Sequence, residues 1–212
     1  MTTLSTMKTR IADELARTDL TSQIGYAISD AISAYDTERW FFSENRDTTF
    51  STVADQEFYT SSDAAGFSNL IAIDYVSLTV ADTPYILLER PPAELEWAST
   101  NSTSTGQPSW FNWYNESLRL YPIPDGVWTG RVVGAFKPSA PATDDETSNP
   151  WMTYAERLIR SRAKLELAVH VLFDRELAAD MSAASDEAWS QLKDHTNMQT
   201  QQGRGLITPM AF

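Results

Sequence analysis

Apolar residues recur every three or four positions in two stretches near the start of the chain. The first stretch, residues 4–15, has charged side chains on its other faces and predicts a short amphipathic helix. The second carries its apolar stripe over residues 24–35 and predicts a helix that runs to about Glu38. Thr21 or Ser22 is expected to cap this helix, because a hydroxyl oxygen can accept a hydrogen bond from a free backbone N–H.

In the middle of the chain the apolar period changes from that of a helix to that of a strand. Near alternation is clearest over residues 72–80. Runs rich in Val, Ile, Thr and aromatic residues lie at 48–53, 57–59, 70–80, 85–88, 117–121 and 127–137. Turn-forming residues separate them, so the region predicts an antiparallel sheet, a sandwich or a small barrel. A short helix is expected at residues 93–98, directly after Pro91 and Pro92, and it is expected to cap one end of the sheet.

A helical period returns after a polar, proline-punctuated linker at residues 139–149. Asn149 is predicted to cap a helix that begins at Pro150, because Asn accepts hydrogen bonds from free N–H groups and Pro at the first position needs no acceptor. The helix is expected to continue to about Arg175, followed by a continuation or by a second helix after a kink. From residue 198 the sequence becomes rich in Gln and Gly and then apolar, which predicts an extended arm that is too short to fold alone.

These patterns together predict the α+β class, with helices at both ends of the chain and an antiparallel β-domain between them. The predicted parts are N-terminal helices at 1–46, the β-domain at 47–138, a linker at 139–149, C-terminal helices at 150–197 and the C-terminal arm at 198–212.

Composition narrows the possible classes of protein. The chain has 212 residues, of which 42% are hydrophobic, enough for one sizeable core or for a core with an inserted subdomain. It has no cysteine, which excludes disulfides, thiolate metal sites and cysteine nucleophiles. The first residues lack a continuous apolar stretch, so neither a signal peptide nor a membrane span is expected there, and the chain is expected to fold in cytosol.

The net charge of −13 is concentrated in the middle of the chain. Residues 47–149 carry four basic and fourteen acidic residues, whereas residues 1–46 and 150–197 each have a net charge of −2. Affinity for DNA comes mainly from Lys and Arg, which displace the counterions condensed on the phosphates. We therefore do not expect a dedicated DNA-binding protein.

Residues that carry chemistry are few and scattered. His170 and His195 lie far apart on helical stretches, and a histidine in such a place is more often packed or solvated than a ligand. The acidic run at 144–146 lacks the ligand spacing of a divalent-cation site. A glycosidase uses two carboxyl groups as acid and nucleophile, and Glu94 with Glu96 or Asp74 with Glu89 could be imagined in these roles. Such pairs occur in any chain that is rich in carboxylates, so they do not indicate a glycosidase. We predict no catalytic residue, metal site or cofactor, and thus no enzyme.

Two groups of residues suggest binding surfaces. The aromatic run at 110–114 could form a platform for sugar rings, which makes a carbohydrate-binding or adhesion β-sandwich module the alternative function. The favoured interpretation is that alternate side chains fill the core, either those of Trp110, Asn112 and Tyr114 or those of Phe111, Trp113 and Asn115. Three basic residues recur at helical steps, namely Arg157, Arg160 and Lys164. They could form an interface face for an acidic partner or DNA. Alternatively, they could form a solvated face in which Glu156 pairs with Arg160.

Five short motifs occur in a fixed order from the end of the first helical block through the β-region. They are Arg-Trp-Phe-Phe at 39–42, Thr-Phe-Ser-Thr at 49–52, Phe-Tyr at 58–59, Gly-Gln-Pro at 106–108 and Leu-Tyr-Pro-Ile-Pro-Asp-Gly at 120–126. With the final amphipathic helix pair, this order resembles the head-to-tail adaptor (head completion or connector) proteins of tailed bacteriophages over most of residues 20–195. Trp40, Phe41 and Phe42 are interpreted as a structural anchor where the first helical block meets the β-domain.

The resemblance implies an α-helical scaffold with an inserted antiparallel β-domain, assembled as a homo-oligomeric ring, commonly of twelve subunits. The ring would be assembled in the host cytoplasm and lie in the neck of the virion, between the portal protein and a tail, stopper or nozzle protein, and DNA would pass through its lumen without specific binding. Family members carry no catalytic residues, so none is transferred to this chain. Their C-terminal extension often docks on the portal, and the arm residues in that position here are Leu206, Ile207, Pro209, Met210 and Phe212.

Overall fold

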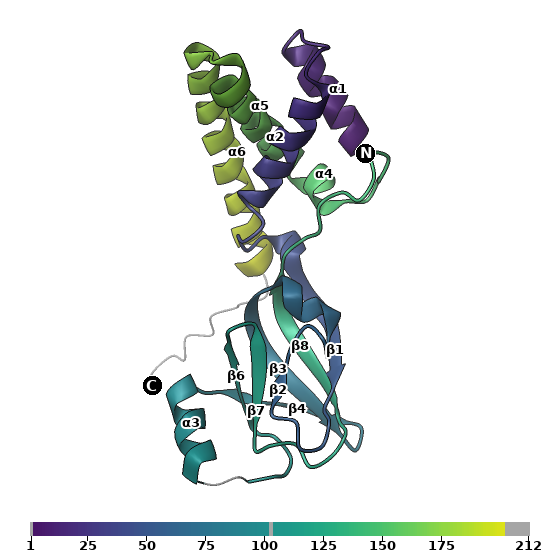
Figure 1. The fold of residues 1–212 in the computed structure, drawn as a ribbon, viewed down its shortest axis with the longest axis vertical. Coiled ribbons are helices and arrows are strands. Elements are labelled where there is room, and N and C mark those ends of the chain that lie inside the picture. Colours follow the sequence, from purple (N-terminus) through teal and green to yellow (C-terminus); the bar gives the residue numbers. More distant parts are fainter. Residues whose placement is uncertain (1, 102–103, 202–212) are drawn as a thin grey trace, which may run out of the picture. The chain divides into compact units, whose positions relative to one another are not determined.

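Helices from both ends of the chain form one unit, and the strands between them form another (Figure 1). The computed structural model describes residues 2–101 and 104–201. About 45% of the residues are helical and about 24% lie in strands, which confirms the α+β class. The helical unit comprises residues up to Phe42 together with those from Pro138 onward, and the β unit is Ser43–Lys137. The first predicted boundary, at residue 46, lies slightly late, because strand β1 already begins at Glu44.

Helix α5 lies at the centre of the helical unit and packs against α1, α2 and α6. The helices of this unit are α1 (Leu4–Glu14), α2 (Thr21–Ser33), α4 (Pro150–Tyr154), α5 (Glu156–Leu167) and α6 (Arg175–Gln201). Apolar residues of all five share one buried core. Met7 and Ile11 of α1 are fully buried in it, so the weak first stripe of the sequence is a packed helix.

Helix α2 differs from its prediction at both ends. It begins at Thr21, with Leu20 in the cap position and no side-chain hydrogen bond there, so the predicted hydroxyl cap is wrong. It ends at Ser33 instead of about Glu38. The carbonyl of Tyr35 accepts hydrogen bonds from the Trp40 indole N–H at 3.1 Å and from the Glu38 amide at 3.2 Å, which turns the chain away from the helix axis.

The predicted cap of the third helical block is confirmed. Asn149 is buried, and its Oδ1 accepts a hydrogen bond from the backbone N–H of Trp151 at 3.1 Å, while its Nδ2 donates to the Ser139 carbonyl at 3.0 Å. The helix does not run on unbroken to Arg175, however. It stops at Tyr154, and α5 then passes into a π-helical turn, Ala168–Leu172.

The chain reverses sharply after the π-helical turn. The sequence left open whether one helix continues or a second follows, and the structure has a second helix. Phe173 adopts a left-handed conformation with φ 54°, and the carboxylate of Asp174 accepts hydrogen bonds from the amides of Glu176 and Leu177 at 3.1 and 3.0 Å. A second helix, α6, therefore starts with its own cap. It continues to Gln201, so residues 198–201 belong to the helix and not to the predicted arm.

The β unit consists of two four-stranded sheets that enclose one apolar core. One sheet has the strand order β1-β8-β3-β4, and the other has the order β2-β7-β6-β5. The strands are β1 (Glu44–Ser51), β2 (Phe58–Tyr59), β3 (Leu70–Val80), β4 (Thr83–Ile86), β5 (Leu88–Glu89), β6 (Trp110–Tyr114), β7 (Ser117–Tyr121) and β8 (Thr129–Phe136). Side chains from both sheets, such as Phe50, Val76, Phe111 and Leu120, meet in this core, as in a sandwich.

One strand pair departs from the predicted antiparallel arrangement. β5 and β6 run parallel, with Leu88 opposite Trp110, because α3 (Pro92–Asn101) and the loop after it carry the chain back between them. α3 does not cap an end of the sheet. Its Leu95 and Ala98 pack with Tyr121 and Trp110 on the face of the sheet that points away from the shared core. Short 3₁₀ turns at Phe41–Ser43 and Ala65–Asn69 complete the described elements.

Candidate assembly interface

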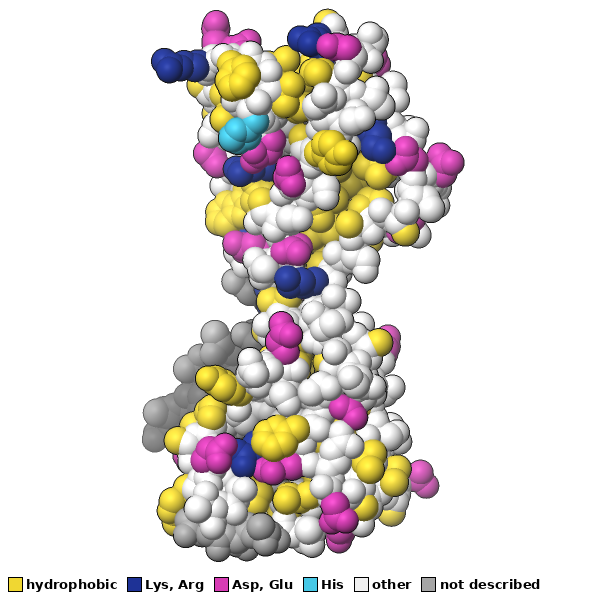
Figure 2. All heavy atoms as spheres, viewed as in Figure 1, with side chains coloured by type: hydrophobic (Ala, Val, Ile, Leu, Met, Phe, Trp, Pro, Cys, Tyr) yellow, Lys and Arg dark blue, Asp and Glu magenta, His cyan; other side chains and the backbone are white. Residues whose placement is uncertain are grey.

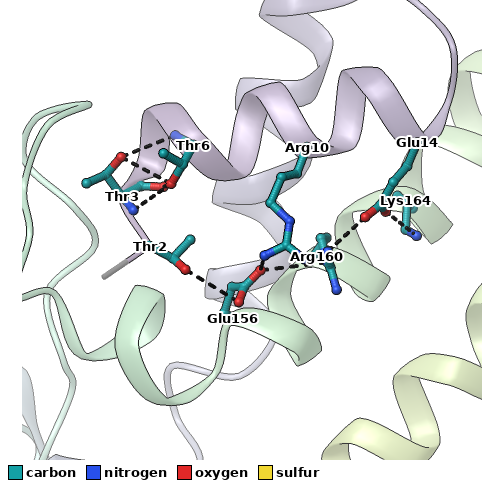
Figure 3. Close-up of polar contacts among 8 residues, drawn as sticks. All are labelled: Thr2, Thr3, Thr6, Arg10, Glu14, Glu156, Arg160 and Lys164. Atoms are coloured by element: carbon teal, nitrogen blue, oxygen red, sulfur yellow. Dashed lines mark hydrogen bonds and ion pairs between the residues drawn. The ribbon is translucent and has the colours of Figure 1, made fainter.

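Two of the three basic residues predicted as an interface face contact the chain's own first helix. Arg160 Nη1 and Lys164 Nζ each lie 2.8 Å from a carboxylate oxygen of Glu14 on α1 (Figure 3). Neighbouring Glu156 Oε1 accepts from Arg10 Nη1 at 2.6 Å. Figure 3 shows these side chains meeting in a row between α1 and α5, so the positive charge of this part of α5 is neutralised within the helical unit.

The environment of Glu14 favours its charged form. Partial burial by itself would raise the pKa of the Glu14 carboxyl, but the hydrogen bond and the charge of Lys164, with the charges of Arg160 and Arg10, outweigh it and hold the pKa below its usual value. Lys164 and Arg160 are only 15% and 19% exposed, and both have the Glu14 carboxylate as a charge partner.

Arg157, the third predicted basic residue, contacts a different helix. Its Nη2 lies 3.0 Å from Glu187 Oε2 and its Nη1 lies 2.9 Å from Gln191 Oε1, both on α6. The Glu156 to Arg160 pair expected for a solvated face is present at 3.9 Å. All three basic side chains thus have partners within their own unit, and a contact of this face with another molecule stays a prediction.

The start of α1 is fixed by two threonines. The Thr3 hydroxyl accepts a hydrogen bond from the Thr6 amide at 3.2 Å, and the Thr6 hydroxyl accepts one from the Thr3 amide at 2.7 Å. This reciprocal arrangement satisfies two N–H groups that a helix start leaves free (Figure 3).

The predicted aromatic anchor lies inside the helical unit. Trp40 is fully buried, and the Lys193 ammonium of α6 lies 4.5 Å from the centroid of its ring. Phe42 stacks between Trp40 and Tyr154, with ring centroids 6.2 and 5.8 Å away. Phe41 meets the edge of Tyr154 at 5.0 Å. These rings join the segment after α2 to α4 and α6.

A groove between α5 and α6 is a feature that the sequence did not indicate. It has a volume of about 200 Å³. Its floor consists of buried apolar residues, and its rim is more polar; the lining residues are Tyr154, Ala155, Arg157, Leu158, Ala188, Gln191, Leu192 and His195. The small residue Ala188 is among the lining residues, but helical periodicity gives no information on which helices meet.

The helical unit also exposes large apolar side chains. Hydrophobic surface is visible over much of this unit in Figure 2. The exposed residues are Tyr26, Tyr154, Val169, Phe173, Trp189 and Met198, and Phe173 is the most exposed of them at 79%. Phe173 lies at the turn between α5 and α6, where its left-handed backbone directs it away from the core. Apolar residues that are exposed singly are common on protein surfaces, and a contact surface is indicated only where several of them adjoin.

The aromatic run at 110–114 does not form a sugar-binding platform. Phe111 and Trp113 belong to the core between the two sheets, and Trp110 packs under α3 with Tyr121. The side chain of Asn112 is buried and donates to the Arg90 carbonyl at 2.8 Å. Only Tyr114 is exposed, so the carbohydrate-binding alternative is not favoured.

The scattered histidines and carboxylates do not converge. Arg119 holds Glu96 at 2.8 Å and Glu57 at 2.6 Å, while Glu94 lies 3.5 Å from Arg90. Within residues 2–101 and 104–201, no group of three or more His, Cys, Asp or Glu residues could hold a metal ion. In the same part of the chain, no helix has the length and apolar character that crossing a membrane requires.

The predicted docking arm cannot be placed on this surface. Its residues Leu206, Ile207, Pro209, Met210 and Phe212 lie outside the described residues. What the structure adds is the point from which the arm departs, the C-terminal end of α6 at Gln201.

Comparison with known families gives a match over nearly the whole chain. The model of the family described as "SU10 adaptor protein" matches residues 2–209, which include both units. No curated protein is similar enough to this chain to count as a match.

Proposed function

The chain belongs to the SU10 adaptor protein family, a phage adaptor family, and from this premise we propose that it is a structural virion protein that joins the head to the tail. In this proposal twelve copies form a ring under the portal protein, in the neck of the virion. The ring binds a tail, stopper or nozzle protein below and leaves a channel for the genome. The observation that carries the proposal is the family match over residues 2–209, because it spans the helical unit and the inserted β unit together.

Exposed apolar residues of the helical unit support the ring. Tyr26 on α2 and Phe173 at the turn before α6 are 71% and 79% exposed. Leaving such large rings in water costs free energy, which burial against a neighbouring subunit would recover at about 25 cal/mol per Å² of apolar surface. The basic residues of α5 are already paired within the subunit, so we propose that apolar contacts provide most of the affinity between neighbours.

The acidic middle of the chain supports a channel that does not hold DNA. Residues 47–149 contain fourteen acidic and four basic residues. A wall of this charge repels phosphates and releases few counterions, so a genome can slide past without specific binding. The role that we propose is mechanical and needs no catalytic residue or cofactor.

The arm after α6 supports a contact with the portal. Leu206, Ile207, Met210 and Phe212 follow a Gly-Arg-Gly sequence at 203–205. Burial of one large apolar side chain contributes about 1.5–3 kcal/mol, and ordering costs about 1–2 kcal/mol per residue, so one arm alone binds weakly. A ring presents many arms at once, and their binding becomes tight through avidity.

The test mixes the purified chain with portal rings and measures the mass of the complex by native mass spectrometry. We expect a complex with a ring of adaptor subunits on each portal. Deleting residues 203–212 should abolish this complex while leaving the melting curve of the free chain unchanged. A length-matched variant, in which Leu206, Ile207, Met210 and Phe212 are replaced by Ser, separates loss of apolar side chains from loss of chain length. If the deletion variant still attaches to portal-bearing heads at the normal rate, the arm is not the docking element.

A further inference from the structure

The outer face of the β1-β8-β3-β4 sheet carries one charged side chain at its centre. Val76 of β3 and Val132 of β8 point into the core between the sheets, so the residues next to them along each strand point outward. The strand register places these outward residues in two rows across the sheet: Thr49, Arg131, Ser77 and Ile86, and then Ser51, Thr129, Thr79 and Pro84. Arg131 is the only charged residue in the two rows.

The guanidinium of Arg131 is exposed and unpaired. Among residues 2–101 and 104–201 it has no ion-pair or hydrogen-bond partner. Ile86, in the same row, is 63% exposed. The β unit as a whole has twelve acidic and five basic residues, yet no carboxylate lies in these two rows. A cation among neutral side chains on an acidic unit suits a contact with a negatively charged surface.

The outer face of the other sheet, β2-β7-β6-β5, carries such a negative charge. Arg119 of β7 has a side chain that is 9% exposed, and its Nε and Nη1 lie 2.6 and 2.8 Å from Oε1 of Glu57 and Oε1 of Glu96. The Phe58 ring lies 5.2 Å from this guanidinium. One cation therefore serves two carboxylates, and the group has a net charge of −1.

Glu96 is the carboxylate of this group that another molecule can reach. Its side chain is 69% exposed, whereas that of Glu57 is 18% exposed. A carboxylate can accept several hydrogen bonds, so Glu96 can bind a second guanidinium while it stays bonded to Arg119. Phe58 and Tyr114 of the same sheet are 49% and 71% exposed. This face thus offers a carboxylate with apolar rings, and the opposite face offers an arginine with an apolar side chain.

The positions of the two faces suit a ring. The sheets enclose one core, so their outer faces point in nearly opposite directions. When one face of a subunit binds a different face of the next, the copies close into a ring if the rotation between them is small and regular. A ring of twelve needs about 30° per step, which two nearly opposite faces provide.

We propose that the two outer faces of the β unit meet between neighbouring copies, and that Arg131 of one copy binds Glu96 of the next. The proposal rests on the ring of the proposed function and identifies faces that meet in it. The ion pair sets the direction of assembly, because a contact between two like faces brings two cations or two carboxylates together. Burial of Ile86, Phe58 and Tyr114 adds apolar contact area.

Charge reversal tests the contact on portal rings. The full chain is titrated onto them, and native mass spectrometry measures the fraction of portals that carry a complete adaptor ring. We expect Arg131→Glu and Glu96→Arg each to raise the concentration for half-complete assembly by about tenfold or more, because close charge pairs across interfaces are strongly coupled. Arg46→Glu and Glu94→Arg are matched controls on β1 and α3 and should assemble like wild type; Glu94 pairs with Arg90 instead.

The two reversed variants should rescue each other. In an equal mixture the copies can alternate around a ring of even number, and every boundary then joins opposite charges. The double variant Arg131→Glu with Glu96→Arg should also assemble, because each of its boundaries joins the two new charges. If neither the mixture nor the double variant restores assembly, the losses come from damage to the fold, and the pair assigned here is wrong.

The absence of cysteine in the chain permits a direct test of place. Arg131→Cys and Glu96→Cys are purified separately, mixed with portal rings and oxidised. We expect disulfide-linked dimers in the mixture and few with either variant alone. Arg46→Cys in place of Arg131→Cys is the control and should give few. Dimers formed by Arg131→Cys alone would show that like faces meet, which contradicts the proposal.

The same titration separates this contact from the proposed function. If the wild-type chain forms no ring on the portal, the proposed function is wrong, and the contact is wrong with it. If the wild-type chain and both reversed variants form complete rings at the same concentration, the ring stands and only the contact between Arg131 and Glu96 is wrong.

Discussion

Trp40 connects several parts of the helical unit. Its ring is fully buried, its indole N–H ends α2 by bonding to the Tyr35 carbonyl, and Lys193 of α6 lies over its face. We expect Trp40→Ala to destabilise the protein by about 3–5 kcal/mol, because a buried Trp leaves a cavity that its neighbours fill only partly. Thermal unfolding followed by the helical circular dichroism signal measures this loss.

The control for that experiment removes an aromatic ring that is not buried. Tyr26 lies on α2 in the same unit and is 71% exposed. Tyr26→Ala should change the free energy of unfolding by about 0.5 kcal/mol or less, as surface substitutions usually do. If the melting temperatures of Trp40→Ala and Tyr26→Ala are both close to that of the wild-type protein, Trp40 does not belong to the core.

Glu14 gives a second prediction, which depends on pH. The pKa of the Glu14 carboxyl is lower in the folded protein than in the unfolded chain. Its contribution to stability is therefore fully present above the ordinary glutamate pKa of about 4.3 and is lost as the pH falls through the lowered folded value. Because the Glu14 side chain is 36% exposed, solvent screening limits the contribution to about 1 kcal/mol.

We therefore expect Glu14→Gln to lower the melting temperature at neutral pH, and we expect this deficit to shrink as the pH falls below the ordinary glutamate pKa of about 4.3 and through the lowered folded pKa. The quantity to measure is the difference in melting temperature between variant and wild type at each pH, since other carboxyls titrate in both proteins. Glu187→Gln is the matched control, because its pair with Arg157 is exposed on both sides. A Glu14→Gln deficit that persists unchanged in acid would show that its charge is not the cause.

At the scale of elements, the close approach of β3 and β8 depends on a glycine. A side-chain carbon at Gly134 would lie 2.1 Å from the Ala72 carbonyl oxygen, and backbone atoms cannot move aside as a flexible side chain can. The register between these strands is irregular between Ile73 and Tyr75, next to this position. Gly134→Ala should destabilise the β unit by about 1–3 kcal/mol or more, because the two strands must separate.

Hydrogen exchange of the amides in β3 and β8 measures this effect locally. Gly126→Ala serves as the control, since an added carbon there meets the Trp128 ring at 3.5 Å, an ordinary contact. We expect faster exchange across both strands in Gly134→Ala and little change in Gly126→Ala. If the two variants exchange alike, the spacing of β3 and β8 is not set by Gly134.

The order of elements could be predicted from the sequence, but several of their ends could not. Alternation over residues 72–80 and the cap at Asn149 are local signals, and both are confirmed by β3 and by the Trp151 N–H bond. The end of α2 depends on Trp40, which reaches back five residues, and periodicity carries no record of such a contact. Likewise, the parallel pairing of β5 with β6 depends on the path of the chain through α3.

The partners of the candidate interface residues could not be predicted from the sequence either. The sequence places Arg157, Arg160 and Lys164 on one stripe of a helix, which is correct as far as spacing goes. Glu14 and Glu187, which neutralise them, are distant in sequence, at positions that only the packing of α1 and α6 on α5 brings close. The groove depends on the same packing.

At the scale of the whole molecule, charge decides whether the protein binds DNA. The net charge is −13, and residues 47–149 account for most of it. The basic side chains of α5 do not offset this negative charge toward DNA, because carboxylates of the same unit already pair with them. Each of Arg157, Arg160 and Lys164 lies within 3.0 Å of such a carboxylate oxygen. A phosphate would have to compete with these carboxylates, which are held at high effective concentration.

We therefore expect the purified protein to show no measurable binding to duplex DNA at about physiological ionic strength. Fluorescence anisotropy with a labelled duplex provides the measurement, and a salt series provides the diagnosis, because phosphate contacts weaken steeply as salt rises. The triple variant Arg157→Gln, Arg160→Gln and Lys164→Gln should behave like wild type in this assay. Micromolar binding that falls with salt, and that the triple variant loses, would show instead that the α5 face releases its carboxylates to bind DNA.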